Sequence, residues 1–374
     1  MHLDGQYVRT EGVNLLSSMS GKTGIAEGAR GLAEALRSAG IPMRHIDSRA
    51  TPGRQLRAVT RENERIYDTT LVVGGLEEIR MSQREERGRI IGYIPWELCA
   101  FPHAYRKLLE TFDEVWTLSR FSAEALSGGL SIPVIRMPLA VDVQNYSNKQ
   151  RADFGIPRNA YVFLFTFDFH SAMERKNPEG LIKSFVQSFA HNKNIFLVIH
   201  GVHSSDFPSD VSILKSTIDG YDNIMLHTHY VSRPDLLALL RCADCFVSLH
   251  RSEGFGLAIA ESMALGIPVI ATDYGGSTDF LTNETGYPVP YSLTTLNKNI
   301  GPYPAGALWA EPDTDHASEL MRKIIENPEE VTAKAHTAKK LMQTEYSLQA
   351  IGQRMKERLL ILRDAPTSSK RSSP

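Results

Sequence analysis

The sequence predicts an α/β protein made of two doubly wound, Rossmann-like domains that face a cleft. Short apolar segments typical of strands alternate with helical segments of about 10–15 residues, which indicates βαβ units and mostly parallel sheets. This alternation runs through two successive cycles, and a polar stretch near 143–152 separates them. The 374 residues are also enough for two domains of roughly 150 residues each.

The two cycles set the expected domain limits. The first domain is expected to cover 1–145 and the second to cover 150–344. A C-terminal helix at about 345–363 is expected to pack back on the first domain. The tail 365–374 contains mainly small and polar residues, so we expect it to be disordered.

The first cycle contains strand-like segments bounded by Gly, Pro or Ser, and two helical patterns. The extended segments are expected at 13–19, 70–75, 90–95, 114–119 and 132–142, and the helices at 24–40 and 121–129. Gly40 stands where a helix commonly ends in a left-handed glycine.

The second cycle repeats the pattern. Strands are expected at 161–168, 195–200, 224–227, 245–250 and 268–272, and helices at 177–191, 232–243, 315–326 and 328–363. Pro178 lies close to the start of its helix, where the missing N–H is harmless.

Composition narrows the class of protein. Apolar residues make up 42% and charged residues 22%, which is an ordinary globular balance. The formal net charge of −2 argues against a nucleic-acid partner. No apolar run approaches the roughly 20 residues of a membrane helix, and the N-terminus lacks the apolar core of a signal peptide. Three cysteines form no disulfide framework, so we expect a cytoplasmic protein.

The stretch "HRSEGFGLAIAES" (250–262) is the main candidate for a site. It follows a predicted strand, and ligands in open α/β sheets bind at the carboxyl ends of the strands. A helix that begins near Gly256 offers free N–H groups and a positive dipole end to an anion. Gly254 and Gly256 would let a phosphate approach the backbone without interference from a Cβ.

Two glutamates flank this turn. Glu261 lies five residues after Gly256, or ~7 Å along a helix axis, which is close to the distance from a nucleotide phosphate to its ribose. A carboxylate there could accept hydrogen bonds from both ribose hydroxyls. Glu253 lies on the other side of the phosphate and would suit the hydroxyls of an attached sugar. The alternative is that both are solvated charges, but the apolar surroundings of Glu261 favour a functional role.

The longer stretch "HRSEGFGLAIAESMALGIPVIATDYGGSTDFL" resembles the signature of retaining, GT-B-fold glycosyltransferases of family 4 (group 1). The resemblance extends from about residue 161 to the last helix, whereas the first half resembles the family mainly in architecture. It implies that Glu261 holds the ribose. It also implies that Glu253, with the backbone of Gly254, Phe255 and Gly256, holds the donor sugar and distal phosphate.

The resemblance also assigns a basic pair. In "FHSAMERKNPEG", Arg175 and Lys176 match the residues that contact the donor diphosphate in this family. The family often has an arginine about six residues before that lysine, and this chain has His170 there. Without the resemblance, a solvated loop would be an equally good interpretation of Arg175 and Lys176.

The activity implied is transfer of a mannose- or glucose-type hexose from a GDP- or UDP-sugar to a saccharide or lipid-linked acceptor, in bacterial surface polysaccharide synthesis. The donor is the substrate, and neither a cofactor nor an essential metal is expected. The departing phosphate would take the acceptor's proton, so no protein nucleophile is needed. The alternatives are a nucleotide-sugar epimerase or phosphorylase of the same fold, or a non-catalytic nucleotide-sugar-binding protein.

Other donor contacts are expected from turns. "MSGKTG" (19–24) lacks the first glycine of a phosphate-binding loop, since Leu16 stands there. The segment Gly21–Gly24 is therefore predicted to be a flexible turn that faces the donor phosphate and the acceptor. Base recognition is expected from largely backbone contacts around Thr228 to Val231, which include Tyr230.

The acceptor side is expected to involve "IPWELCAFP" (94–102). Trp96 could stack on a sugar and Glu97 could orient a hydroxyl, although core packing of Trp96 is an equally good interpretation. An arginine stripe suggests a second contact, with anionic lipid, and hence a peripheral association with the inner membrane. Interleaved glutamates favour a solvated face instead. The stripe consists of Arg54, Arg57, Arg61 and Arg65.

Two short patterns are given structural interpretations. "DTD" (313–315) imitates a metal-binding carboxylate pair, but Asp315 is expected to be a helix N-cap. "CADC" (242–245) has redox spacing, but it joins a helix to an apolar strand, where free cysteines behave as small buried hydrophobes.

Overall fold

A computed structural model describes residues 9–21, 23–48, 67–74 and 88–364 of the chain. The arginine stripe at 54–65 and the tail 365–374 lie outside the described residues. The chain divides into two compact units. The first comprises Met1–Ala140 and Glu345–Pro374, and the second comprises Val141–Thr344.

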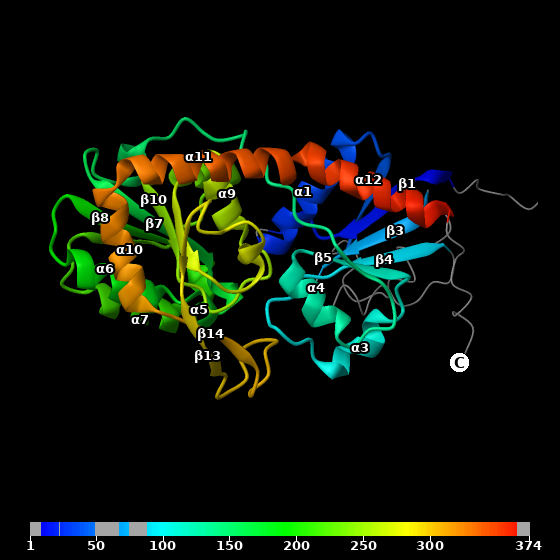
Figure 1. Cartoon of the computed structure of the whole chain (residues 1–374), viewed down its shortest axis with the longest axis horizontal. Coiled ribbons are helices and arrows are strands. Elements are labelled where there is room, and N and C mark those ends of the chain that lie inside the picture. Colours follow the sequence, from blue (N-terminus) through cyan, green and yellow to red (C-terminus); the bar gives the residue numbers. More distant parts are fainter. Residues whose placement is uncertain (1–8, 22, 49–66, 75–87, 365–374) are drawn as a thin grey trace, which may run out of the picture. The chain divides into compact units, whose positions relative to one another are not determined.

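The first unit contains a parallel sheet of six strands in the order β2-β1-β3-β4-β5-β6. Its strands are β1 (Arg9–Ser17), β2 (Met43–Asp47), β3 (Tyr67–Val73), β4 (Arg89–Tyr93), β5 (Glu114–Thr117) and β6 (Val134–Arg136). Its described helices are α1 (Gly24–Ser38), α3 (His103–Leu109), α4 (Arg120–Ser127) and α12 (Leu348–Asp364). Helix α12 packs along α1 (Figure 1).

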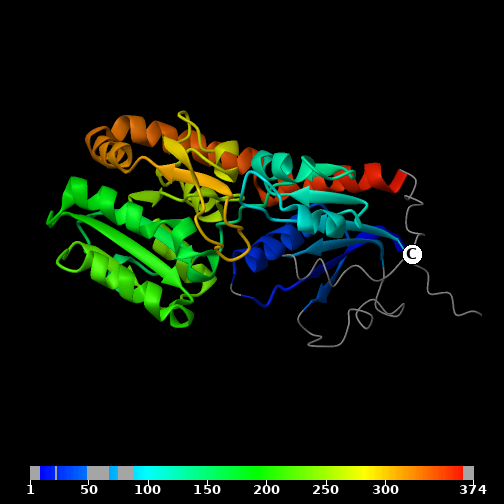
Figure 2. The same cartoon turned by 90° about the horizontal axis from the view of Figure 1, so that it is seen from below.

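The second unit contains another parallel sheet of six strands, in the order β12-β11-β10-β7-β8-β9. Its strands are β7 (Tyr161–Asp168), β8 (Ile195–Val202), β9 (Ile224–His227), β10 (Cys245–Ser248), β11 (Val269–Thr272) and β12 (Tyr287–Val289). An antiparallel hairpin adds β13 (Tyr291–Thr295) and β14 (Leu308–Pro312). Figure 2 shows green helices on both sides of this sheet, so the predicted doubly wound α/β fold is confirmed.

The helices of the second unit begin with the short α5 (Met173–Lys176) and end with the long α11. The others are α6 (Pro178–Phe189), α7 (Pro208–Ile218), α8 (Arg233–Arg241), α9 (Leu257–Leu265) and α10 (Thr314–Glu326), and α11 covers Pro328–Glu345. Helix α10 packs against α6. The central strand β7 is buried along most of its length, with Phe163 and Leu164 at 0% and 1% exposure, as its apolar sequence predicts.

Three local predictions need correction. The helix expected at 328–363 is two helices, because Ser347 accepts a hydrogen bond from Ala350 N and starts α12 anew. The N-cap of α10 is Asp313 rather than Asp315: the Asp313 side chain accepts from the N–H groups of Asp315 and His316. Strand β2, helices α3 and α7 and strands β12 to β14 were not expected from the sequence.

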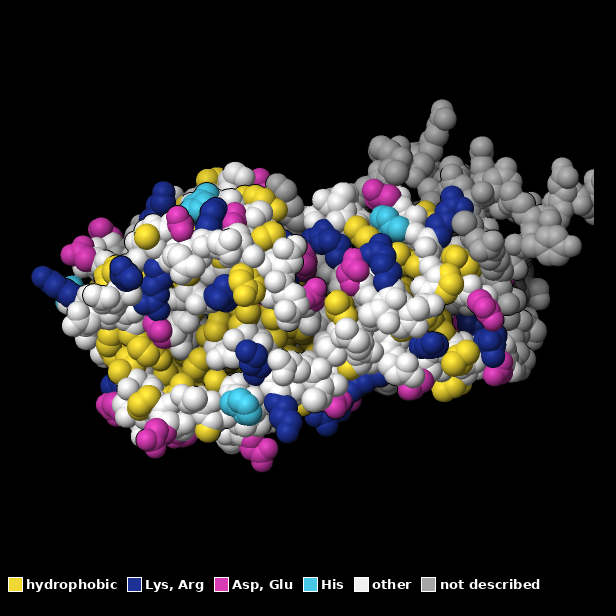
Figure 3. Space-filling view, turned by 90° about the horizontal axis from the view of Figure 1, so that it is seen from above, with side chains coloured by type: hydrophobic (Ala, Val, Ile, Leu, Met, Phe, Trp, Pro, Cys, Tyr) yellow, Lys and Arg dark blue, Asp and Glu magenta, His cyan; other side chains and the backbone are white. Residues whose placement is uncertain are grey.

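Other predictions agree with the structure. Gly40 has φ +68° just beyond α1, in the left-handed region. Cys242 and Cys245 are both free and buried, and burial raises the pKa of each thiol, which suits packing rather than redox chemistry. None of the described helices is both long and apolar enough to cross a membrane. Acidic and basic side chains are interspersed on the face seen in Figure 3.

Candidate active site

The loop after β7 delivers Arg175 and Lys176. Asn177 ends α5 in the left-handed conformation (φ 55°), which asparagine tolerates better than most residues. Its side chain accepts from Gly180 N to cap α6 and donates to Leu249 O at 2.8 Å. The sequence Asn-Pro therefore both starts α6 and fixes the preceding basic pair against the end of β10.

The segment that follows β10 is hydrogen-bonded to the loop that carries Arg175. Arg251 N donates to Arg175 O at 2.8 Å, and Arg175 Nη1 donates to Ser252 O at 2.8 Å. Arg175 is only 4% exposed, so its guanidinium belongs to the buried part of the site and is not part of a solvated loop. Two segments about 75 residues apart in sequence thus meet at the carboxyl ends of neighbouring strands.

Glu253 lies where the two segments meet. Its carboxylate forms ion pairs with Lys176 Nζ and, at 3.5 Å, with Arg175 Nη1. Burial alone would raise the pKa of Glu253, but Lys176 and Arg175 outweigh it and lower the pKa to about 2. Glu253 is therefore ionised at neutral pH and can accept hydrogen bonds but cannot supply a proton.

A glycine turn closes around the backbone of Glu253. Gly275 has φ +90°, and a Cβ there would lie 2.6 Å from Glu253 O. The next residue, Gly276, donates its N–H to the same carbonyl at 2.7 Å. Only glycine fits position 275, because a side chain would push the Glu253 backbone away.

Helix α9 starts immediately after the turn, as predicted. Gly256 is its N-cap residue, with φ +86°. Phe255 is 3% exposed and packs edge-on against Phe280, with ring centroids 5.2 Å apart. Phe255 thus anchors the turn, while the first N–H groups of α9, which have no partner within a helix, provide the anion-binding end.

Glu261 is buried in α9 with 2% exposure, and it has a charged partner. Arg233 Nη2 lies 2.5 Å from Glu261 Oε1. Arg233 is the first residue of α8, whose N-cap is Ser232. This ion pair explains how an apolar helix tolerates a carboxylate, and it fixes the direction of the Glu261 side chain.

The segment after β9 lies at the carboxyl edge of the same sheet. The Ser204 hydroxyl donates to Thr228 O at 2.7 Å, and Tyr230 is 52% exposed. His200 is buried beside it, with Nε2 3.2 Å from His229 O, and burial lowers the pKa of His200 to about 4. Thr228 and Tyr230 thus lie where a base could reach backbone groups, although Thr228 O already accepts one hydrogen bond.

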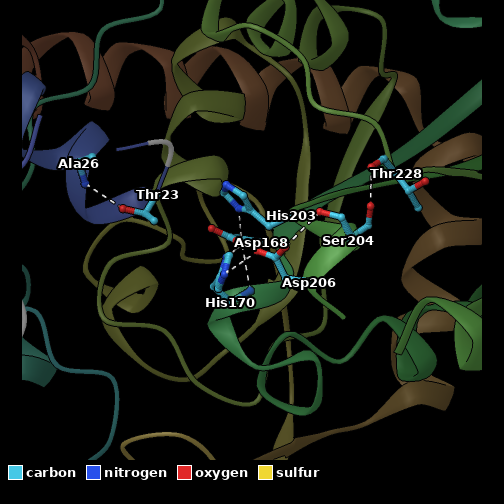
Figure 4. A network of polar contacts seen from close by, with 9 residues as sticks. Thr23, Ala26, Asp168, His170, His203, Ser204, Asp206 and Thr228 are labelled. Carbon is cyan, nitrogen blue, oxygen red and sulfur yellow. Dashed lines mark hydrogen bonds and ion pairs between the residues drawn. The ribbon is translucent and has the colours of Figure 1, made fainter. Parts of the chain in front are cut away.

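In the first unit, Gly24 begins α1, and the Thr23 hydroxyl caps the helix by accepting from Ala26 N (Figure 4). Gly21 O accepts from Arg30 Nη1 at 3.1 Å, so this end of the turn is held in place. Trp96 is 3% exposed, which favours the core alternative over sugar stacking.

The contacts of Trp96 and the exposure of Glu97 separate the roles of these two neighbours. The Trp96 indole donates to Ala100 O at 3.0 Å and packs edge-on against Phe101. Glu97 is half-buried. It remains the better candidate of the two for contact with an acceptor.

Three contributors to the site were missed from the sequence: Arg233, Gly275 and Arg251. Arg251 forms a two-pronged ion pair with Glu311 of β14 (2.6 and 2.9 Å) and donates to Glu174 O. The double glycine after a strand was a usable signal for Gly275. No local signal identifies Arg233 or Arg251, because their partners are distant in sequence.

One more group of side chains could hold a metal ion. Asp168, His170 and His203 offer ligand atoms that all lie within 4.8 Å of one another. They lie at the ends of β7 and β8, at the same sheet edge as the basic pair.

Two doubly wound sheets, with a glycine turn and a helix start at the carboxyl edge of one of them, define the GT-B class of fold. A crystal structure of HepE from Anabaena in complex with UDP and glucose matches with a TM-score of 0.70 and 14% identity, over 94% of this chain and 100% of that one. Sucrose-phosphate synthase from Thermosynechococcus elongatus matches with a TM-score of 0.72 and 16% identity, over 94% and 99%.

The chain belongs to the family described as glycosyl transferases group 1, whose model matches residues 147–341. A D-inositol 3-phosphate glycosyltransferase of Arthrobacter is 31% identical over 37% of this chain and 32% of its own length. A GDP-mannose-dependent monoacylated α-(1-6)-phosphatidylinositol monomannoside mannosyltransferase of Corynebacterium glutamicum is 24% identical over 66% of this chain and 60% of its own length. The matched segments thus span between a third and three fifths of these relatives.

Proposed function

We propose that the chain is a retaining glycosyltransferase that moves a mannose- or glucose-type hexose from a nucleoside-diphosphate sugar to a saccharide or lipid-linked acceptor. The observation that carries this proposal is the cluster of Lys176, Arg175 and Glu253 beside the N-terminus of α9. Positive groups, a fixed carboxylate and a helix start occupy one sheet edge, as a donor diphosphate and its sugar require.

The basic groups would stabilise the leaving diphosphate. As the glycosidic bond breaks, negative charge develops on the oxygen that departs with the phosphate, and preorganised positive groups lower that barrier. Lys176 is 16% exposed at its side chain and can reach a ligand, whereas Arg175 is buried and bonded to Ser252 O. Lys176 would therefore contact the diphosphate, and Arg175 would mainly hold Glu253 and the loop in place.

Glu253 would bind the sugar as an ionised acceptor of hydrogen bonds. With a pKa of about 2, it has no proton to give a leaving group, so a general-acid role is disfavoured. Retention would follow from attack on the same face of the sugar, with the departing phosphate taking the acceptor's proton. That route needs no protein nucleophile and no bridging Mg²⁺ or Mn²⁺.

Glu261 would bind the ribose. The ion pair with Arg233 directs its carboxylate, so that it could accept from the ribose hydroxyls. The base would meet the backbone near Thr228 and Tyr230, and Gly21 and Gly24 of the first unit would approach the donor phosphate. Glu97 would serve the acceptor.

The names of the relatives support a class of substrate. One is named for GDP-mannose and a phosphatidylinositol mannoside, another is a lipopolysaccharide core mannosyltransferase of Rhizobium meliloti, and HepE was crystallised with UDP and with UDP-glucose. We therefore infer a GDP- or UDP-sugar donor and a role in surface polysaccharide synthesis. The enzyme would work in the cytoplasm, with a peripheral contact to the inner membrane where the acceptor is lipid-linked.

A thermal-shift panel of UDP, GDP and ADP tests the donor. A nucleotide at 100 times its Kd stabilises the folded state by ~2.7 kcal/mol, so the cognate base should stand out. The matching nucleotide sugar should then release nucleoside diphosphate faster with a saccharide acceptor than in water. Binding without any turnover would favour a non-catalytic sensor, and absence of a shift with all three nucleotides would overturn the proposal.

A further inference from the structure

A group of polar side chains gathers where β7 and β8 end. Asp168 is the last residue of β7 and pairs in register with Val202, the last residue of β8. His170 lies in the short turn after β7, and His203 follows β8 directly. The parallel register therefore brings the two histidines to the same carboxylate, as Figure 4 shows.

One oxygen of Asp168 is approached by three nitrogens. Oδ1 lies 3.0 Å from His170 N, 3.2 Å from His170 Nδ1 and 2.9 Å from His203 Nδ1. A carboxylate oxygen has about two lone-pair positions, so this oxygen is crowded by donors. A cation bound between the carboxylate and the two rings would replace both ring protons and relieve the crowding.

The spacing suits a small transition-metal ion. With bonds of about 2.1 Å, neighbouring ligands of a tetrahedral Zn²⁺ lie about 3.4 Å apart. Asp168 Oδ1 meets the two Nδ1 atoms at 3.2 and 2.9 Å, and all three ligand atoms fall within 4.8 Å of one another. Two imidazoles and one carboxylate favour Zn²⁺ over Mg²⁺ or Ca²⁺, which prefer oxygen ligands alone.

Metal-binding histidines commonly have a carboxylate on the ring nitrogen that does not face the metal, and His170 has this outer support. His170 Nε2 lies 3.2 Å from Asp206 Oδ2, on the side of the ring away from Asp168. A carboxylate on the second ring nitrogen orients a ligating imidazole and makes it a better ligand. Phe207 packs edge-on against His170, with centroids 5.2 Å apart. Asp168 and Asp206 also bring two negative charges, which suit a divalent cation.

We propose that Asp168, His170 and His203 bind one Zn²⁺ ion, with Asp206 as the outer support of His170. The ion would link the loop after β7 to the loop after β8. Because Arg175 and Lys176 follow in the first of these loops, the ion would stiffen the segment that carries them. Zn²⁺ binding at this site does not depend on which nucleotide sugar the protein uses.

Isothermal titration of the full-length, tag-free protein with Zn²⁺, after removal of metals with EDTA, tests the site. The wild type should bind one equivalent, and Co²⁺ should give the visible absorption of a low-coordinate site. Saturating Zn²⁺ should also raise the melting temperature by several degrees. Mg²⁺ at the same concentration should neither bind at this site nor raise the melting temperature.

The variants make the test specific. His203→Asn keeps a residue that tolerates the left-handed backbone (φ 60°) and should lower Zn²⁺ affinity at least about 100-fold. Asp206→Asn should lower it about 10- to 100-fold. His191→Asn is a matched control, because His191 also has φ 60° but lies elsewhere, stacked on Tyr221.

His170→Gln, at a more exposed position, provides a second ligand variant if His203→Asn folds poorly. It should lower Zn²⁺ affinity in the same way as His203→Asn. Failure of the wild type to bind Zn²⁺, or equal binding by His170→Gln or a folded His203→Asn, would overturn the assignment.

Discussion

Glu253 is a residue of the site whose ionisation the fold controls. Its folded-state pKa of about 2 is below its ordinary value of 4.5. A lowered pKa contributes stability that is complete above pH 4.5 and is lost as the pH falls toward 2. Because 2.5 pKa units correspond to about 3 kcal/mol, Glu253→Gln should lower the free energy of unfolding by up to that amount at pH 6.

Urea unfolding at pH 6 and pH 3 checks this prediction. The difference between wild type and Glu253→Gln should be about 2 kcal/mol smaller at pH 3, because there the unfolded chain has taken up a proton on this carboxylate while the folded state is still mostly ionised. Glu284→Gln, at an exposed position, is the control and should show no such change. A pH-independent difference would mean that Lys176 and Arg175 do not hold the ionised form.

Glu261 should act on donor binding rather than on chemistry. Glu261→Gln keeps the side-chain volume but weakens the hydrogen bonds that the ribose would receive, so the donor KM should rise about tenfold while kcat changes little. Arg233→Ala should raise the KM in the same way, because it releases the carboxylate that Arg233 directs. Steady-state kinetics with varied donor measures both, and an unchanged KM in Glu261→Gln would remove Glu261 from the ribose site.

At the scale of single residues, the sequence predicted Glu253, Glu261 and the glycine turn but not the side chains that pair with the two glutamates. Glu253, Glu261 and the glycine turn form one continuous pattern, and the apolar neighbours of Glu261 indicated that a partner was needed. Arg233 could not be named, since 28 positions separate it from Glu261 and many arginines could have served. Trp96 was left open because a strand-end aromatic can face either the core or a ligand, and packing with Phe101 places it in the core.

Helix α12 depends on a close approach to α1. A Cβ at Gly352 would lie 2.2 Å from Ala35 O and 2.8 Å from Ser38 Oγ. Gly352→Ala should therefore destabilise the first unit by about 1–3 kcal/mol, despite the better helix propensity of alanine. Thermal unfolding and hydrogen exchange of α1 peptides would measure the loss.

Gln353→Ala, one residue further and exposed, is the control for this helix contact and should be nearly neutral. Equal stability of Gly352→Ala and Gln353→Ala would show that α12 does not pack closely on α1. Arg358, further along α12, forms a partly buried ion pair with Glu114 of β5 at 2.5 Å, so the helix has a second attachment to the same unit.

The elements with strong apolar patterns were predicted within a few residues. Strand β7 matches its expected range 161–168, and α6 and α8 begin next to the capping residues Asn177 and Ser232. Elements stabilised by distant contacts were missed. Strand β13 of the hairpin is mostly exposed, and the hairpin is held partly by the Arg251–Glu311 ion pair.

At the scale of the whole molecule, sugar transfer would need no Mg²⁺ or Mn²⁺, because Lys176 and the α9 N-terminus would supply the positive charge. We expect kcat in EDTA to equal kcat with added Mg²⁺, within about twofold. Strict dependence on Mg²⁺ or Mn²⁺ would contradict this mechanism. A loss in EDTA that Zn²⁺ restores and Mg²⁺ does not would instead belong to the site at Asp168.

The most direct test of the central claim is the rate of nucleoside-diphosphate release from the cognate nucleotide sugar, compared among wild type, Lys176→Ala and Lys183→Ala. Lys176→Ala should lower kcat by ~10²-fold or more, the scale of losing one preorganised charge stabiliser, with a smaller effect on donor binding. Lys183→Ala, on the exposed face of α6, should turn over like the wild type. Wild-type turnover by Lys176→Ala would contradict the placement of sugar transfer at this site.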